Sequence, residues 1–96
     1  METQTNSILI HESDDVATAI VELCRGERAR FWRRGEIEEI EIAETIPQYH
    51  KFALRPIRQK DAIRKYGEVI GTASCDISMG AHVHVHNVES SGGQGA

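Results

Sequence analysis

The chain has few of the features that mark several protein classes. Its 96 residues include only two cysteines, Cys24 and Cys75, which form neither a CxxC pair nor a dense framework. A disulfide scaffold is therefore not expected, and two buried thiols in a reducing compartment are the simpler interpretation. Aromatic residues make up 5% of the chain, and no apolar run approaches the ~18 residues of a membrane helix. The sequence predicts no membrane span.

Charge and length narrow the remaining classes. The formal net charge of -4 argues against a general affinity for nucleic acid, whose backbone attracts positive surfaces. The N-terminal segment lacks the positive and apolar regions of a secretory signal, so a cytoplasmic protein is expected. A chain of this length suits one small domain that buries roughly 60 to 65% of its unfolded surface. A large enclosed active site is not expected.

One basic segment, residues 25–34, departs from the acidic average. It places Phe31 and Trp32 among five arginines: Arg25, Arg28, Arg30, Arg33 and Arg34. Such a segment can bind phosphates and stack on bases, so an RNA-binding module is one hypothesis. The next segment carries five glutamates: Glu36, Glu38, Glu39, Glu41 and Glu44. A charge-paired hairpin is the favoured interpretation.

The overall pattern predicts a mainly β domain with one helix. The helix is predicted from an N-cap at Ser13 or Asp14 to a terminating Gly26. Its apolar residues recur at helical spacing: Val16, Ala19, Ile20 and Leu23. Short strands are predicted at residues 6–11, 29–32, 37–43, 51–57, 68–77 and 82–88. We expect a flexible N-terminus (1–7), one domain (8–88) and a disordered tail or linker (89–96).

The stretch "GAHVHVHNV" places histidines at every second position: His82, His84 and His86. On a strand these side chains share one face and lie ~6.6 to 7 Å apart at Cα. Two such rings can reach one metal ion at ~2.0 to 2.1 Å, so the three histidines are metal candidates. The pattern places no further ligand beside them. A sheet face whose imidazoles form hydrogen bonds is the alternative.

Two more polar stretches precede an apolar strand or a turn. His50 and Lys51 come before "FAL", and Lys65 and Tyr66 come before Gly67. Strand ends are where rigid scaffolds present binding groups. Lysine and histidine at such positions can hold a carboxylate as charge-assisted donors.

Four segments together resemble a known family. They are "HESDDVATAI", "IPQYHKFAL", "IRKYGEVIG" and "DISMGAHVHVHNV", in this order. They resemble the small N-terminal domain of the altronate and galactarate dehydratase family, which some members carry as a separate chain, as in the small (alpha) subunit of sulfolactate sulfo-lyase. The resemblance covers residues 8–88 and implies a compact SAF-type β-clip.

The resemblance also implies a function. The chain would be an accessory small subunit or domain of a hydroxy-acid lyase, which eliminates water from sugar acids such as altronate or galactarate, or sulfite from sulfolactate. A large catalytic subunit would carry a divalent metal, iron, and most catalytic groups, and this chain would not be catalytic alone. The alternatives are a free-standing metal or small-acid binding domain and the RNA-binding module. Formation of a homo-oligomer is a further alternative, because small β domains with exposed strand edges often pair.

Roles for single residues follow from motif position. The catalytic candidates are His84 and His86, with His82 added as a metal candidate. The substrate-binding candidates are His50, Lys51, Lys65, Tyr66 and Asn87. The sequence departs from the family at Lys60, which stands where a glycine turn is usual, so a remodelled turn is expected there.

Overall fold

The computed structural model describes residues 4–90 and contains strands and turns. The strands are β1 (Ser7–Ile8), β2 (Val16–Ala19), β3 (Arg28–Arg33), β4 (Glu36–Glu41), β5 (Lys51–Ala53), β6 (Ala62–Lys65), β7 (Glu68–Ala73), β8 (His82–Val83) and β9 (Val88–Ser90). The mainly β prediction is confirmed. Between residues 4 and 90 no helix is long and apolar enough to cross a membrane.

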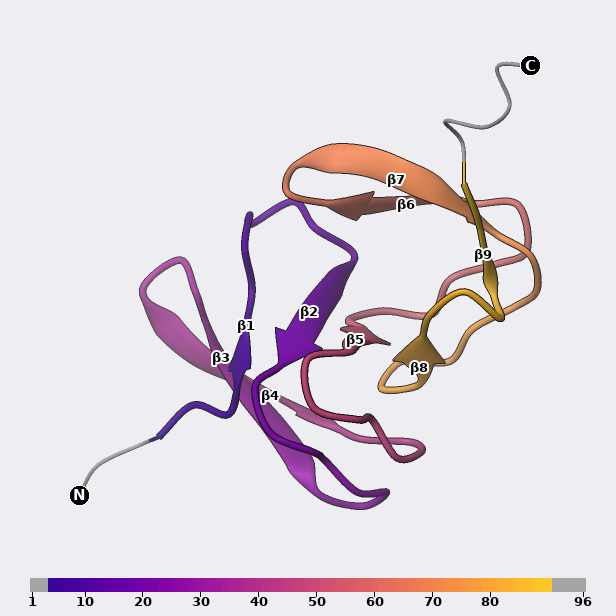
Figure 1. The fold of residues 1–96 in the computed structure, drawn as a ribbon. Helices are drawn as coiled ribbons and strands as arrows, with labels where there is room; N and C mark the ends of the chain where they lie inside the picture. Colours follow the sequence, from indigo (N-terminus) through magenta and orange to yellow (C-terminus); the bar gives the residue numbers. More distant parts are fainter. Residues whose placement is uncertain (1–3, 91–96) are drawn as a thin grey trace.

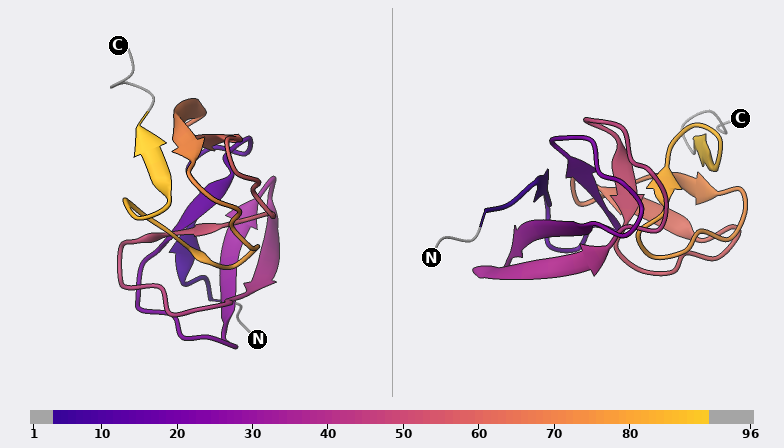
Figure 2. Two further views of the ribbon diagram at one scale, coloured as in Figure 1. Left: turned by 90° about the vertical axis from the view of Figure 1, so that its right-hand side faces the viewer. Right: turned by 90° about the horizontal axis from the view of Figure 1, so that it is seen from below.

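The strands form three antiparallel sheets. The central sheet has the order β1-β2-β5-β8, β3 and β4 form a hairpin, and the third sheet has the order β6-β7-β9. In Figure 1 the β3–β4 hairpin and the β6–β7 hairpin lie on opposite sides of the central strands. The left view of Figure 2 also shows the magenta β3–β4 hairpin apart from the orange β7 strand. This arrangement of short sheets is consistent with the expected β-clip.

Two apolar cores lie on the two faces of the central sheet. Along β2, Ala17 and Ala19 belong to the core that contains Phe31 and Phe52. The alternate residue Val16 belongs to the second core, with Ile57, Ile63 and Val83 among its members. Successive side chains of a strand point to opposite faces, so one short strand contributes to both cores. The central sheet is thus covered on both sides.

The predicted helix is wrong. Residues 16–19 form β2, which pairs with β1 and β5, and no helix occurs in the described part of the chain. Val16, Ala17 and Ala19 are all buried, because both faces of this strand are covered. A short apolar run that is buried on both faces resembles a buried helix segment, since periodicity does not separate the two. The segment forms a strand because β1 and β5 pair with it on either side.

Four turns of the same form connect the strands. Each follows a buried apolar residue and has a left-handed third residue. The buried residues are Leu23, Ile46, Ile57 and Ile77, and the left-handed residues are Gly26, Tyr49, Lys60 and Gly80. The buried residues also pair in two bridges, Leu23 with Ile46 and Ile57 with Ile77. At these four turns the chain passes from the central sheet into each hairpin and returns from it to the central sheet.

Lys60 keeps the turn geometry that a glycine would adopt. Its φ is 73°, and its turn closes with a 2.9 Å hydrogen bond from the Asp61 amide to the Arg58 carbonyl. The same left-handed region is occupied by Gly26 and Gly80 in the equivalent turns, so Lys60 adopts a conformation that glycine favours.

The arginines and glutamates form the predicted charge-paired hairpin. In β3 and β4, Arg28 lies opposite Glu41, and Arg30 lies opposite Glu39. The Arg30 guanidinium is 2.8 Å from the Glu39 carboxylate. Arg28 and Arg33 make longer ion pairs, with Glu39 at 3.5 Å and Glu38 at 3.4 Å. These pairs neutralise much of the basic segment that motivated the RNA hypothesis.

Several finer expectations need correction. Both thiols are free, but they are exposed, so the prediction of buried cysteines is wrong. Strand β6 was not predicted, and the strand predicted at 82–88 ends at Val83. Ser7 lies in β1, while Glu89 and Ser90 lie in β9 rather than in a tail. The outer parts of both predicted termini, residues 1–3 and 91–96, lie outside the described residues.

Candidate functional site

The pairing of β5 with β8 brings two distant histidine segments together. Lys51 lies opposite Val83, and Phe52 lies opposite His82. Continuing this register by one residue places His50 opposite His84. Nδ1 of His50 is 2.8 Å from Nε2 of His82, which is a hydrogen-bond distance. A backbone ladder therefore positions side chains that are 32 residues apart in the sequence.

Four imidazoles gather at this point, and we call them the histidine cluster: His50, His82, His84 and His86. The ring centroids of His50 and His84 are 4.2 Å apart, and those of His50 and His82 are 5.0 Å apart. His86 lies at the exposed margin of the cluster: its ring is 5.1 Å from that of His82, but its side chain is exposed, whereas the other three residues are half-buried. The expectation that three histidines share one strand face is wrong in detail. A strand end and a turn bring the rings together instead.

Asn87 shapes the turn that carries His84 and His86. Its side chain is buried, with 6% of its surface exposed. Its Oδ1 accepts a 2.9 Å hydrogen bond from the His84 amide, and its Nδ2 donates one of 2.9 Å to the His82 carbonyl. Both ends of the amide are therefore engaged with backbone. Asn87 thereby positions the histidines, and its predicted contact with substrate stays a prediction.

Burial and crowding alter the protonation of two cluster members. Burial, followed by the charge of His50, lowers the pKa of His82. The same two causes, followed by Lys51, lower the pKa of His84. Taking an imidazolium out of water and placing it beside other cations disfavours the charged form. The two rings therefore favour the neutral state near pH 7.

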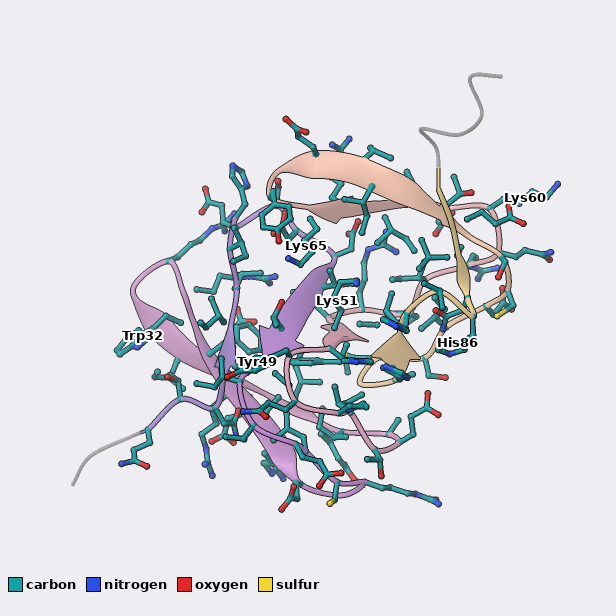
Figure 3. All side chains as sticks on the ribbon, viewed as in Figure 1. Trp32, Tyr49, Lys51, Lys60, Lys65 and His86 are labelled. Carbon is teal, nitrogen blue, oxygen red and sulfur yellow. The ribbon has the colours of Figure 1, made fainter. Side chains whose placement is uncertain are left out.

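Two lysines lie close to one another, and one of them, Lys51, borders the histidine cluster at His84. Lys65 is buried, with 9% exposed, and its Nζ lies 3.6 Å from the centroid of the Tyr66 ring. By hydrogen bonding first and by charge second, Lys65 lowers the pKa of the exposed Tyr66 hydroxyl. Lys51 is half-buried, and burial followed by the charge of Lys65 lowers its pKa. In Figure 3, Lys51 lies between Lys65 and His86, whereas Trp32 and Lys60 lie at the edges of the molecule.

Lys51 lines two neighbouring grooves. One of about 430 Å³ is bordered by Ile8, Ile10, Thr18, Ile20, Tyr49, Lys51, Lys65 and Tyr66. The other, of about 190 Å³, is bordered by Lys51, Ile70, His84, Val85 and Val88. The first groove is bordered by both lysines, and the second by Lys51 together with His84 of the histidine cluster. Such a surface can bind a small anion and place it beside imidazole nitrogens.

Comparison with known proteins agrees with this architecture. The family model of the altronate/galactarate dehydratase SAF domain matches residues 5–91. The chain belongs to this SAF-domain family. The three motifs that the structure gathers around Lys51, "HKFAL", "KYG" and "HVHVHN", all lie within the matched range.

The SAF domain has both long and short relatives. It is 43% identical over 82 residues to the altronate dehydratase of Bacillus subtilis, covering 85% of this chain and 16% of that protein. It is 36% identical over 80 residues to the altronate dehydratase of Escherichia coli, covering 83% and 15%. The chain thus spans about a sixth of these enzymes. It is also 33% identical over 85 residues to (2R)-sulfolactate sulfo-lyase subunit alpha of Chromohalobacter salexigens, covering 84% and 90%.

The SAF domain brings most of the predicted site residues to one region. His50, expected only as a substrate ligand, is the ring that joins His82 and His84, whereas His86 is peripheral. The sequence position of His50 directly before a strand was the available signal. Asp14, expected at a helix start, instead accepts hydrogen bonds from the amides of Tyr66 and Gly67, at 3.0 and 2.8 Å. No local pattern distinguishes that role from an N-cap.

Proposed function

We propose that this SAF domain is an accessory subunit or domain of a hydroxy-acid lyase. It contributes substrate-binding and proton-donating groups to an active site that a larger catalytic portion completes. The substrate class is a small hydroxy acid: a sugar acid such as altronate or galactarate, or sulfolactate. The names of the relatives support this class, and the short alpha-subunit relative supports a separate accessory chain.

The observation that carries the proposal is the convergence of the histidine cluster with Lys51 on one face. Elimination beside a carboxylate needs a base for the α-proton, a stabiliser for the developing enolate, and a donor to the leaving group. The two grooves are open and small, at about 430 and 190 Å³. They supply one wall of a site rather than a water-excluding pocket. In this proposal a partner surface completes the site, and the chain alone is not catalytic.

The roles of the side chains follow from charge and position. Lys51 and Lys65 border the same groove and bind the carboxylate or sulfonate of the substrate. His84 or His86 donates a hydrogen bond or a proton to the departing group. His50 and Tyr66 border the bound acid. The divalent metal that the family resemblance implies, iron, belongs to the larger portion in this proposal.

Reconstitution with the candidate large subunit tests the proposal. The two chains are co-expressed and purified through a tag on this one, and 2-keto acid formation is measured with and without it. We expect a stable complex and activity that depends on this chain. Equal activity of the large subunit alone, or failure of the two chains to associate, would refute an accessory role.

A further inference from the structure

We propose that His50, His82 and His84 bind one divalent transition-metal ion on this chain itself. This site is separate from the metal expected on a larger subunit, and nothing in its construction requires a partner. His50 lies directly before β5, His82 lies in β8, and His84 lies in the segment that follows β8. Two of them flank or belong to a hydrogen-bonded strand pair, so the ladder fixes their relative positions.

The geometry of the ring nitrogens is suited to a shared ion. One ligand atom from each of the three residues lies within 4.8 Å of the other two. The closest pair, Nδ1 of His50 and Nε2 of His82, is 2.8 Å apart. Nitrogens bound at ~2.0 to 2.1 Å to one ion lie about 2.9 to 3.4 Å apart. One pair already has nearly this spacing, and the third ring needs to approach by less than about 2 Å.

The hydrogen bonds of the cluster do not account for all three rings. A single hydrogen bond joins His50 and His82, whereas Nδ1 of His84 is buried and has no partner among the described residues. An unsatisfied buried polar atom is unusual and destabilising. A metal ion accepts a lone pair from each of the three neutral rings. Each imidazole, including that of His84, then has a partner.

The ligand set indicates the class of ion. Three imidazole nitrogens with no carboxylate among them suit zinc, iron, cobalt, nickel or copper rather than magnesium or calcium, which prefer oxygen. Three protein ligands also leave a coordination position open, as in catalytic rather than structural zinc sites. Lys51 and His84 border the same small groove. An anionic oxygen donor that enters this groove would meet both the ion and the ammonium group.

Metal titration of the isolated full chain tests this site. The protein is stripped with a chelator and titrated with Zn²⁺ by calorimetry, and with Co²⁺ followed by visible absorption. We expect one ion per chain, a Co²⁺ spectrum typical of nitrogen ligands, and no binding of Mg²⁺. Absence of Zn²⁺ and Co²⁺ binding, or equal binding of Mg²⁺, would overturn the proposal.

Matched glutamine variants assign the ligands. His50→Gln and His84→Gln should each weaken Zn²⁺ binding by more than the 10- to 100-fold that loss of an outer partner costs. His86→Gln, from the margin of the cluster, should stay within about threefold of wild type. If His86→Gln removes binding as completely as His50→Gln does, the assignment is wrong. Circular dichroism verifies folding, and either ligand variant alone suffices if the other does not fold.

These outcomes are independent of the accessory role. Metal binding is measured without any partner or substrate, whereas the accessory role is measured as partner-dependent activity. A chain that binds Zn²⁺ but does not activate a large subunit would keep the metal site and refute the lyase proposal. A chain that activates a large subunit but does not bind Zn²⁺ would keep the lyase proposal and refute the metal site.

Discussion

Single residues in this domain owe their properties to neighbours that are distant in sequence. The clearest case is the pair His82 and His84, whose pKa values are lowered first by burial and then by His50. The other charged groups that act on them are His86, Lys51 and Glu44, of which only Glu44 raises a pKa. Folding therefore disfavours the protonated form of both rings.

Stability should consequently decrease at mildly acidic pH. The unfolded chain, whose histidines titrate near pH ~6.5, takes up protons before the folded chain does as the pH falls. The free energy of unfolding should be level above about pH 6.5 and should fall below it. Urea unfolding at a series of pH values between about 5 and 8 measures this dependence.

A double variant supplies the control for this pH dependence. His82→Gln with His84→Gln removes both titrating groups while His11, His50 and His86 remain. Its stability should change less with pH than that of the wild type. A slope as steep as that of the wild type would show that other groups cause the acid sensitivity.

Backbone strain at Lys60 gives a second prediction at this scale. With φ at 73°, Lys60 is in a region that costs an L-residue about 1 kcal/mol and costs glycine little. Lys60→Gly should therefore raise the free energy of unfolding by about 0.5 to 1 kcal/mol, measured by urea unfolding. Gln59→Gly, one residue earlier and without a positive φ, should instead lower it. Equal effects of the two glycines would contradict the strain argument.

At the scale of elements, Asp14 joins two parts of the chain. Its buried carboxylate accepts hydrogen bonds from the amide of His11 at 3.1 Å and from those of Tyr66 and Gly67 in the β6–β7 turn. The neighbouring Asp15 accepts a 2.8 Å bond from the Arg64 amide. These acids connect the segment before β2 to the hairpin that carries Lys65 and hold that hairpin beside the central sheet.

Loss of the Asp14 carboxylate should destabilise the domain strongly. Asp14→Ala leaves three backbone amides without their acceptor, and hydrogen bonds to a charged group contribute roughly 1.5 to 3 kcal/mol each without being additive. We expect a loss of about 2 to 4 kcal/mol in the free energy of unfolding. Glu12→Ala, which removes only an exposed ion pair with Arg34, should cost far less stability than Asp14→Ala does. Similar losses in the two variants would refute the tethering role.

At the scale of the whole molecule, the fold gathers three separated motifs around one lysine. His50 precedes β5 and Lys51 begins it, Lys65 ends β6 and Tyr66 follows it, and residues 82–87 form β8 and the turn after it. Lys51 borders both grooves of the site, so it is placed to contact an anion from either side. The charge-paired hairpin lies on the other side of the central strands, away from this face (Figure 1).

Neutralising Lys51 should affect substrate binding in the reconstituted lyase. Lys51→Met keeps most of the length of the side chain but removes the charge that binds the carboxylate. We expect KM to rise by about 10- to 100-fold, since a charge-assisted pair contributes roughly 1.5 to 3 kcal/mol. Lys60→Met, at the edge of the molecule in Figure 3, should leave KM unchanged. A rise in KM of the same size in both variants would contradict the role of Lys51 in substrate binding.

The sequence alone was sufficient for the fold class and the charged hairpin. Alternating Ile40 and Ile42, short runs punctuated by glycine, and opposite charges in consecutive segments are local patterns that predict strands and their pairing. The resemblance of four segments to a known family extended the mainly β prediction to a SAF-type β-clip. The same local reasoning failed at residues 16–19, where burial on both faces produced a spacing that also suits a helix.

Local composition therefore determined that this chain forms short strands and which residues could do chemistry. Only the tertiary structure decided which of those residues meet. Register is a non-local property: the pairing of Lys51 with Val83 is what places His50 beside His82 and His84 and leaves His86 at the margin. Burial likewise depends on what the rest of the chain lays over a residue, so the lowered pKa values and the engaged Asn87 amide arise only after folding.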